Sequence, residues 1–125
     1  MSDLGQAMAV SSSGLAAQSA RLRVTAENIA NTDTPGYRSK ALRFGIAGHG
    51  GVETGGVALS AAPLRRVHDP SHPLAGADGG YDGSNVNLML ELANAREAQR
   101  SYEANLRLFD QARQMASSLT DLLRR

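Results

Sequence analysis

Residues 85–125 read NVNLMLELANAREAQRSYEANLRLFDQARQMASSLTDLLRR and contain neither glycine nor proline. Positions spaced alternately by four and three residues run through this stretch, as in the heptad seam of a coiled coil. They are Leu88, Leu92, Ala95, Gln99, Tyr102, Leu106 and Phe109, continued with a small phase shift by Ala112, Ala116, Leu119 and Leu123. The pattern predicts a C-terminal helix over 85–125, capped by Ser84 or Asn85. About 38 residues at ~1.5 Å each give a rod of roughly 55 Å, which is too long for the rest of the chain to bury.

A second, weaker heptad pattern covers residues 3–31. Its seam consists of Leu4, Met8, Ser11, Leu15, Gln18, Leu22, Thr25 and Ile29. We expect Asp3 to act as the N-cap, with Gln6 three residues later. Three of the eight seam residues are small or polar, and Gly5 and Gly14 lower the intrinsic helicity further. This helix is therefore expected to need a partner helix to become ordered.

The middle of the chain is rich in helix breakers. Residues 32–84 hold all four prolines and eleven of the 13 glycines. Alternating apolar side chains in 42–46 predict a strand, and Val57 and Leu59 are its expected partner, connected through 48–56. Residues 63–73 are expected to be extended and rich in turns.

Together these patterns predict a mainly α fold. Long N- and C-terminal helices pair as a coiled-coil-like layer, with a small irregular or β-hairpin middle segment. The segments are 1–36 (helix and turn), 37–84 (middle) and 85–125 (C-terminal helix), and the two terminal helices form one helical domain.

The composition argues against several classes of protein. The formal net charge is +1, so no strong field draws the chain to nucleic acid or to an anionic membrane. Because there is no cysteine, disulfides and thiolate metal sites are excluded. No apolar run approaches the ~20 residues of a membrane span, and residues 1–15 lack the basic and apolar regions of a Sec signal peptide.

No motif indicates catalysis. His68 and His72 have the four-residue spacing of a helical zinc site, but Pro70 between them and Pro73 after them predict an ordinary turn. The glycine-rich residues 48–56 lack the Gly-Lys-Ser/Thr ending of a phosphate-binding loop. There is no Gly-x-Ser-x-Gly elbow, and a small hydrolase is the disfavoured alternative. We predict no catalytic, cofactor-binding or metal-binding residue and a protein that is not an enzyme.

The two amphipathic helices are too long for the small middle segment to cover, so other chains should cover their apolar faces. The predicted subunit interface comprises Leu4, Met8, Leu15, Leu22, Ile29, Leu88, Leu92, Tyr102, Leu106, Phe109, Leu119 and Leu123.

Residues 24–37, VTAENIANTDTPGY, resemble the N-terminal signature of the flagellar rod and hook protein family. In that family an N-terminal helix ends in Ala-x-Asn-[Ile/Leu]-Ala-Asn and breaks into a Pro-Gly-Tyr turn. The matching turn residues are Asn28, Asn31, Pro35, Gly36 and Tyr37. Asn31 can end the helix, and Pro35-Gly36 can turn the chain into the middle segment.

Two further stretches are similar to one branch of this family, a protein of the proximal rod. They are VHDPSHPLA at 67–75 and the start of the C-terminal helix, which holds Asn85-Val86-Asn87, Glu91 and RSYEAN at 100–105. Tyr37-Arg38 follows the Pro-Gly turn at once, and the middle segment is short, as in a sister rod protein. That sister protein is the nearest alternative within the family.

The resemblance implies a structural subunit of the bacterial flagellar basal body that polymerises through its terminal helices into a torque-transmitting rod crossing the periplasmic space. It also implies export without a Sec signal, by the flagellar type III apparatus, and contacts with other rod subunits and basal-body proteins. A helical secretion adaptor or chaperone, binding its client as a soluble dimer, is the alternative from another class. Such a protein would lack the asparagine and Pro-Gly-Tyr turn.

Overall fold

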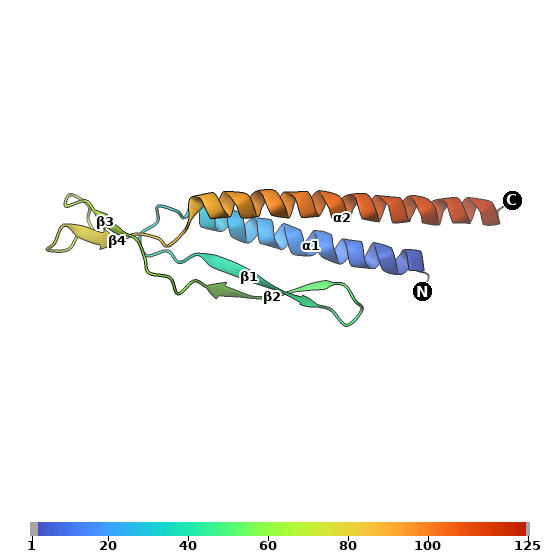
Figure 1. The fold of residues 1–125 in the computed structure, drawn as a ribbon, viewed down its shortest axis with the longest axis horizontal. Coiled ribbons are helices and arrows are strands. Elements are labelled where there is room, and N and C mark those ends of the chain that lie inside the picture. Colours follow the sequence, from blue (N-terminus) through green and yellow to red (C-terminus); the bar gives the residue numbers. More distant parts are fainter. Residues whose placement is uncertain (1–2, 125) are drawn as a thin grey trace.

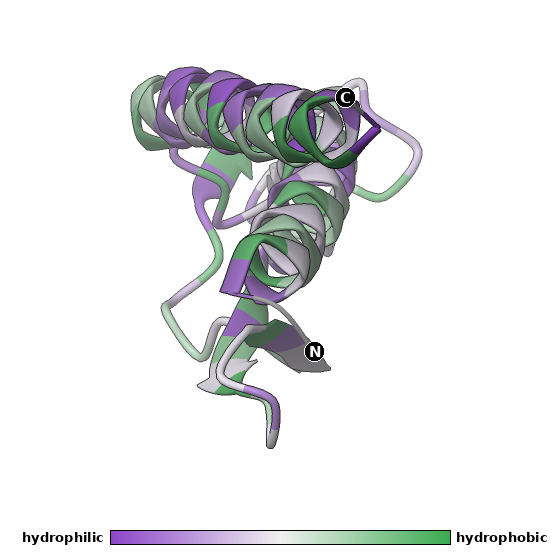
Figure 2. Ribbon diagram, turned by 90° about the vertical axis from the view of Figure 1, so that its right-hand side faces the viewer, coloured by the Kyte–Doolittle hydropathy of each residue, from purple (hydrophilic) through white to green (hydrophobic). Residues whose placement is uncertain are grey.

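The computed structural model describes residues 3–124, in which two long helices frame four short strands. The elements are α1 (Asp3–Ala30), β1 (Lys40–Ile46), β2 (Val52–Leu59), β3 (Arg66–His68), β4 (Gly80–Asp82) and α2 (Leu88–Leu123). The helices run antiparallel, and the β3–β4 hairpin lies beyond the end where α2 begins (Figure 1). The view along the helices places α1 between α2 and the β1–β2 hairpin (Figure 2). The predicted mainly α fold, with paired terminal helices and a β-hairpin middle, is confirmed.

Small and polar side chains pack the two helices together. At Gly14 a Cβ atom would lie 2.6 Å from Oδ1 of Asn105, so the close approach depends on the missing side chain. Arg21 and Glu97 form an ion pair across the helices, with 3.2 Å between Nη2 and Oε2. Four of the six buried hydrophobic residues are alanines: Ala17, Val24, Ala47, Val86, Ala98 and Ala112. The core is therefore thin.

The predicted leucine seam of the C-terminal helix is not the stripe that joins the two helices. Its leucines are between 41% and 86% exposed: Leu88, Leu92, Leu106, Leu119 and Leu123. The buried residues of α2 are Glu91, Ala98 and Ala112, whose spacings also fit a heptad, and only Ala112 belongs to the predicted seam. Small side chains occupy the contact because they let the helices come close, and the leucines stay on the outside.

The middle segment holds two hairpins, and only the first was predicted. In the first, β1 and β2 pair antiparallel from Lys40↔Leu59 to Ile46↔Val52. The second strand begins at Val52, so Gly55 and Gly56 lie within it and not in the connection as expected. They form a β-bulge there, because β2 has one residue more than β1 between neighbouring pairs.

The second hairpin lies where an extended, turn-rich stretch was predicted. Here β3 pairs antiparallel with β4, from Arg66↔Asp82 to His68↔Gly80. Arg66 also forms ion pairs with Asp78 at 2.8 Å and with Asp82 at 3.2 Å. Strands of three residues are too short for their alternation to be seen in the sequence.

Both helix starts differ from the prediction. Asn87 caps α2, because its side-chain oxygen accepts a hydrogen bond from the N–H of Leu90 at 3.2 Å. Ser84 and Asn85, the predicted caps, lie before it. Asp3 is already helical, and the residues before it lie outside the described range. In residues 3–124 no helix has the length and apolar character needed to cross a bilayer.

Candidate assembly surface and the polar junction

Asn28 lies at the centre of a polar junction between the end of α1 and the start of β1. Its side chain is 1% exposed. Oδ1 accepts hydrogen bonds from the N–H of Lys40 at 2.9 Å and from the hydroxyl of Tyr37 at 2.8 Å, while Nδ2 donates to the carbonyl of Lys40 at 2.8 Å. The amide thus pairs with both backbone groups of Lys40, as a neighbouring strand would, and fixes the point where β1 leaves α1.

The Pro-Gly-Tyr turn connects this junction to the second hairpin. Gly36 has a φ of +75°, in the left-handed region that favours glycine, and its N–H donates to the carbonyls of Asp82 and Gly83 at 3.2 Å each. Burial raises the pKa of Tyr37 above its ordinary value, although the nearby Lys40 opposes the shift. The Tyr37 hydroxyl therefore keeps its proton and remains a donor to Asn28 at neutral pH.

Asn31 has a local role. Its Nδ2 donates to the carbonyl of Glu27 at 2.8 Å, and its Oδ1 accepts from the hydroxyl of Thr34 at 3.0 Å. These bonds satisfy backbone and side-chain groups where α1 ends. Of the predicted turn residues, Asn28, Gly36 and Tyr37 make the long-range contacts.

Ser84 and Asn85, which the sequence predicts as alternative caps of the C-terminal helix, complete the junction. The Ser84 hydroxyl donates to the carbonyl of Thr32. The side chain of Asn85 accepts from the N–H of Ser39 at 2.6 Å and donates to the carbonyl of Ala62 at 3.0 Å. The one sequence signal was a run of polar residues before Leu88, and a helix cap gives the same signal.

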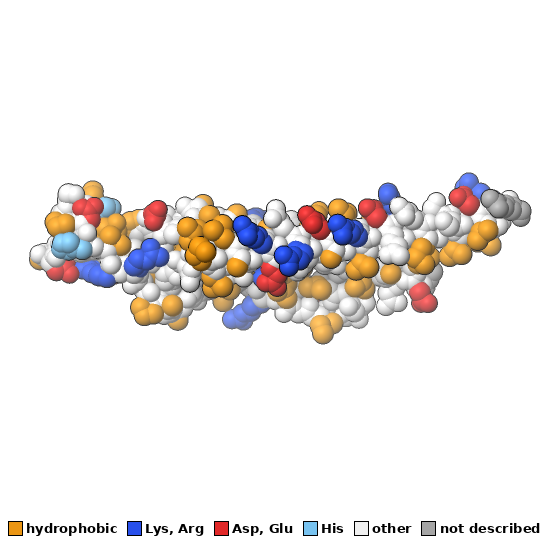
Figure 3. All heavy atoms as spheres, turned by 45° about the horizontal axis from the view of Figure 1, so that its top comes forward, with side chains coloured by type: hydrophobic (Ala, Val, Ile, Leu, Met, Phe, Trp, Pro, Cys, Tyr) orange, Lys and Arg blue, Asp and Glu red, His pale blue; other side chains and the backbone are white. Residues whose placement is uncertain are grey.

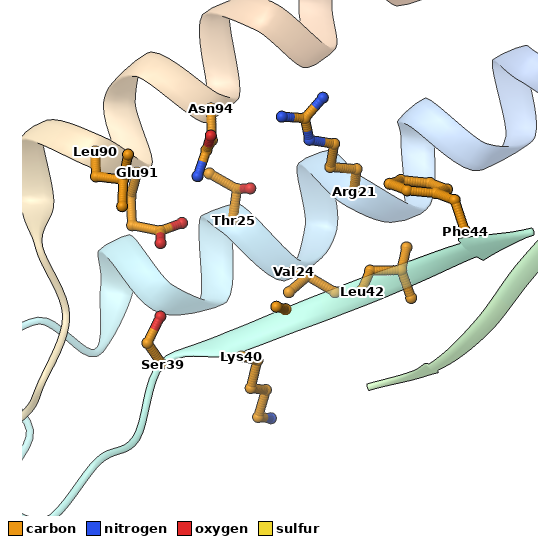
Figure 4. Close-up of a pocket in the computed structure, with 11 residues that line it drawn as sticks. Arg21, Val24, Thr25, Ser39, Lys40, Leu42, Phe44, Leu90, Glu91 and Asn94 are labelled. Carbon is orange, nitrogen blue, oxygen red and sulfur yellow. The ribbon is translucent and has the colours of Figure 1, made fainter. Parts of the chain in front are cut away.

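An open groove of about 530 Å³ lies beside the junction, between α1, β1 and the first turn of α2 (Figure 4). It is lined by Arg21, Val24, Thr25, Ser39, Lys40, Ala41, Leu42, Phe44, Leu90, Glu91 and Asn94. Its two cations already have partners outside the groove: Arg21 pairs with Glu97, and Lys40 pairs with Glu27 at 3.2 Å.

Glu91 is the acidic residue of this groove. It extends from α2 into the space between the helices and β1 (Figure 4), and it is 6% exposed. Within residues 3–124 its carboxylate has neither a hydrogen bond nor an ion pair. Its oxygens are not among the buried side-chain atoms that lack a partner, so they face the open groove and are accessible to a cation of another molecule.

The predicted interface residues of α2 lie mostly on its outer surface. Hydrophobic side chains recur along this helix towards its C-terminal end (Figure 3). Tyr102 and Phe109 are half-buried, whereas the five predicted leucines are exposed. The predicted members on α1 are all half-buried: Leu4, Met8, Leu15, Leu22 and Ile29. No neighbouring chain is present, so their role as a subunit interface stays a prediction.

His68 and His72 lie at the second hairpin, away from the groove. The ring of His72 stacks on that of Tyr81, with centroids 4.0 Å apart. In the described part of the chain no three His, Asp or Glu side chains gather as a metal site would require.

Comparison with known proteins finds similarity at both ends of the chain. A family described as "Flagella basal body rod protein" matches residues 8–38, and "Flagellar basal body rod FlgEFG protein C-terminal" matches residues 78–122. These segments hold the asparagine turn and most of α2.

Curated relatives match across both segments. "Flagellar basal-body rod protein FlgC" of Agrobacterium fabrum is 38% identical over 136 aligned positions, covering 99% of this chain and 98% of that protein. The proteins of the same name from Salmonella typhimurium and Yersinia enterocolitica are 38% and 39% identical, over 85% and 81% of this chain and 87% and 84% of their own lengths. The alignment with the first relative has 136 positions and this chain has 125 residues, so at least 11 of those positions are gaps in this chain.

Proposed function

Because the chain belongs to the FlgC family of flagellar basal-body rod proteins, we propose that it polymerises through its terminal helices within the proximal rod and transmits torque there. It is a structural rod subunit. The similarity noted at 67–75 and 85–105 indicated this branch, and the relatives' names confirm it. FlgB, the sister protein considered as the alternative, is therefore set aside.

The observation that supports polymerisation is that α2 keeps its large apolar side chains outside its own fold. They are Leu88, Met89, Leu90, Leu92, Leu106, Leu108, Met115, Leu119, Leu122 and Leu123, all at least 41% exposed. Burying one leucine contributes about 2 kcal/mol, so neighbouring subunits that cover this helix gain several such terms. Burial of the alanines in the core of the subunit contributes far less free energy per residue.

We further infer that the subunit leaves the cytoplasm through the flagellar type III apparatus, without a Sec signal, and that its rod crosses the periplasmic space. Its partners are other rod subunits and basal-body proteins, and its role is structural, not catalytic. The names of the relatives support the basal-body location, and the weak heptad of α1 is compatible with export as an unfolded chain.

A deletion strain complemented with tagged chain tests this function. We expect the deletion to abolish swimming, the full-length chain to restore it, and isolated basal bodies to contain the tag. Normal swimming by the deletion strain would contradict the proposal. Recovery of the tag only as a soluble dimer bound to a client would support the adaptor alternative instead.

A further inference from the structure

The C-terminal end of α2 extends past the start of α1, and no other helix of residues 3–124 lies beside it (Figure 1). We call residues 119–124 the overhang. Its leucines, Leu119, Leu122 and Leu123, are 52%, 61% and 86% exposed. Arg124 follows them, exposed and without an ion pair in the described chain. The overhang thus presents an apolar patch next to a free cation.

The groove at the other end of the helix pair has the complementary character. Val24, Leu42, Phe44 and Leu90 supply apolar walls, and the unpartnered carboxylate of Glu91 lies among them. A segment that fits must carry both apolar side chains and one unpaired cation, because the groove's own cations are already occupied.

We propose that this groove receives the overhang of a second copy of the chain, with its leucines against the apolar walls and the Arg124 guanidinium on Glu91. The inference rests on the proposed function and names the contact through which one subunit holds the next. An arginine fork on an unpaired carboxylate forms a strong charge-assisted pair.

The positions of the two surfaces favour a polymer over a closed dimer. The groove lies where α2 begins and the overhang where it ends, so the contact joins different patches on the two copies. A heterologous contact of this kind generates an open helical assembly unless its rotation happens to close a ring.

A second groove on the same molecule is a poorer acceptor. It has a volume of about 500 Å³ and is lined by Met89, Leu92, Ala93, Arg96, Glu97 and Arg100. Its two arginines would repel Arg124, and its one acidic residue already pairs with Arg21. Charge therefore selects the groove that contains Glu91.

Disulfide trapping tests the contact directly, because the chain has no cysteine of its own. Full-length L42C and L122C proteins are purified separately, mixed at equal concentration and oxidised. We expect a disulfide-linked dimer containing one of each. The matched control replaces L42C by R43C, since the neighbouring side chain of a strand points to the opposite face. Equal yields from the two mixtures would overturn the proposal.

Charge reversal sharpens the same experiment. R124E in the L122C chain should lower the trapped yield about tenfold, and E91R in the L42C chain should restore it when the two are mixed. Arg124 is exposed at the end of the helix, so R124E remains informative even where E91R fails to fold. An unchanged yield with R124E would exclude the Glu91 contact.

Basal bodies from cells expressing the R124E chain separate this inference from the function on which it rests. Strongly reduced incorporation supports the contact. Normal incorporation rejects the contact and leaves the rod function standing, whereas absence of even the unmodified chain from basal bodies rejects the function.

Discussion

The junction around Asn28 and the overhang at 119–124 are opposite ends of one helix pair, and different forces act at each. At the junction, polar side chains are buried and hydrogen-bonded to backbone groups. At the overhang, leucines are 52–86% exposed. Hydrogen bonds are directional and fix the geometry of the chain, whereas burial of apolar surface is not directional and stabilises a complex with any partner that covers it. Folding and assembly therefore depend on separate residues.

Truncation after Gln111 tests this separation with the largest expected effect. It removes Met115, Leu119, Leu122 and Leu123, each of which contributes on the order of 2 kcal/mol when a neighbour buries it. We expect the shortened chain to be made but to be absent from isolated basal bodies. Its Lys40 amide should still be protected from hydrogen exchange, because the junction remains. Normal amounts in basal bodies of swimming cells would show that the end of α2 is dispensable.

Asn28→Ala should produce the largest loss of folding stability. The change leaves the N–H and carbonyl of Lys40 without their partner, and each orphaned group costs about 1–3 kcal/mol, so the free energy of unfolding should fall by about 2–4 kcal/mol. Urea unfolding measures it. Asn31→Ala is the matched control, because its bonds are local and half-exposed, and it should cost about 1 kcal/mol or less. Equal losses would mean that the junction does not depend on Asn28.

Gly36→Ala should destabilise the chain by about 1–2 kcal/mol, because alanine pays that cost in the left-handed region. Gly48→Ala provides the comparison: its φ is ordinary, and a Cβ there meets nothing within 4 Å. The two thermal midpoints decide the matter. If both variants melt alike, the positive φ of the turn is not a constraint.

Because Gly14 contacts Asn105, the effect of Gly14→Ala on stability should change sign when Asn105 is also replaced. Gly14→Ala alone should lower stability, because the new Cβ would lie within 2.6–2.9 Å of the Asn105 side chain. In an Asn105→Ala background the same change should raise stability by up to about 1 kcal/mol, through better helix propensity. A double-mutant cycle in urea measures the coupling. Additive effects would show that the close packing seen here is not maintained in solution.

Replacing His68 and His72 by alanine together should have the smallest effect. The stack on Tyr81 is half-exposed, so its loss should cost less than about 1 kcal/mol and leave swimming largely intact. If the double variant is non-motile, the second hairpin must itself be needed for motility, in addition to the helix pair. Swimming-halo diameters on soft agar compare it with Gly36→Val, which we expect to be more severe.

The two helices could be predicted because glycine and proline are absent from 88–123 and rare in 3–30. Their contact could be predicted only in part. Ala112 belongs to the predicted seam and is buried, whereas the seam leucines lie on the outside, and Ala98 and Glu91 occupy the contact without having been assigned to the seam. Hydrophobic periodicity gives most weight to large apolar side chains, so it cannot tell which of two neighbouring stripes of the helix makes the close contact.

The polar junction was predicted in part. The turn residues were identified, since a Pro-Gly pair after a helix signals a change of direction. The pairing of Asn28 with the backbone of Lys40, and of Asn85 with Ser39, was not identified, because such bonds depend on where distant backbone groups meet. The lack of a partner for Glu91 could not be predicted either, because acidic and basic residues alternate along this helix.

The long separation between partners in the sequence has a consequence for synthesis. Arg21 pairs with Glu97, 76 residues later in the sequence. The residues of α2 that are buried against α1 lie between 91 and 112. On the ribosome, α1 therefore emerges long before its partner exists, and its weak helicity leaves it exposed to other ligands during that interval. The order of synthesis therefore delays the pairing of the two helices until most of the chain has been made.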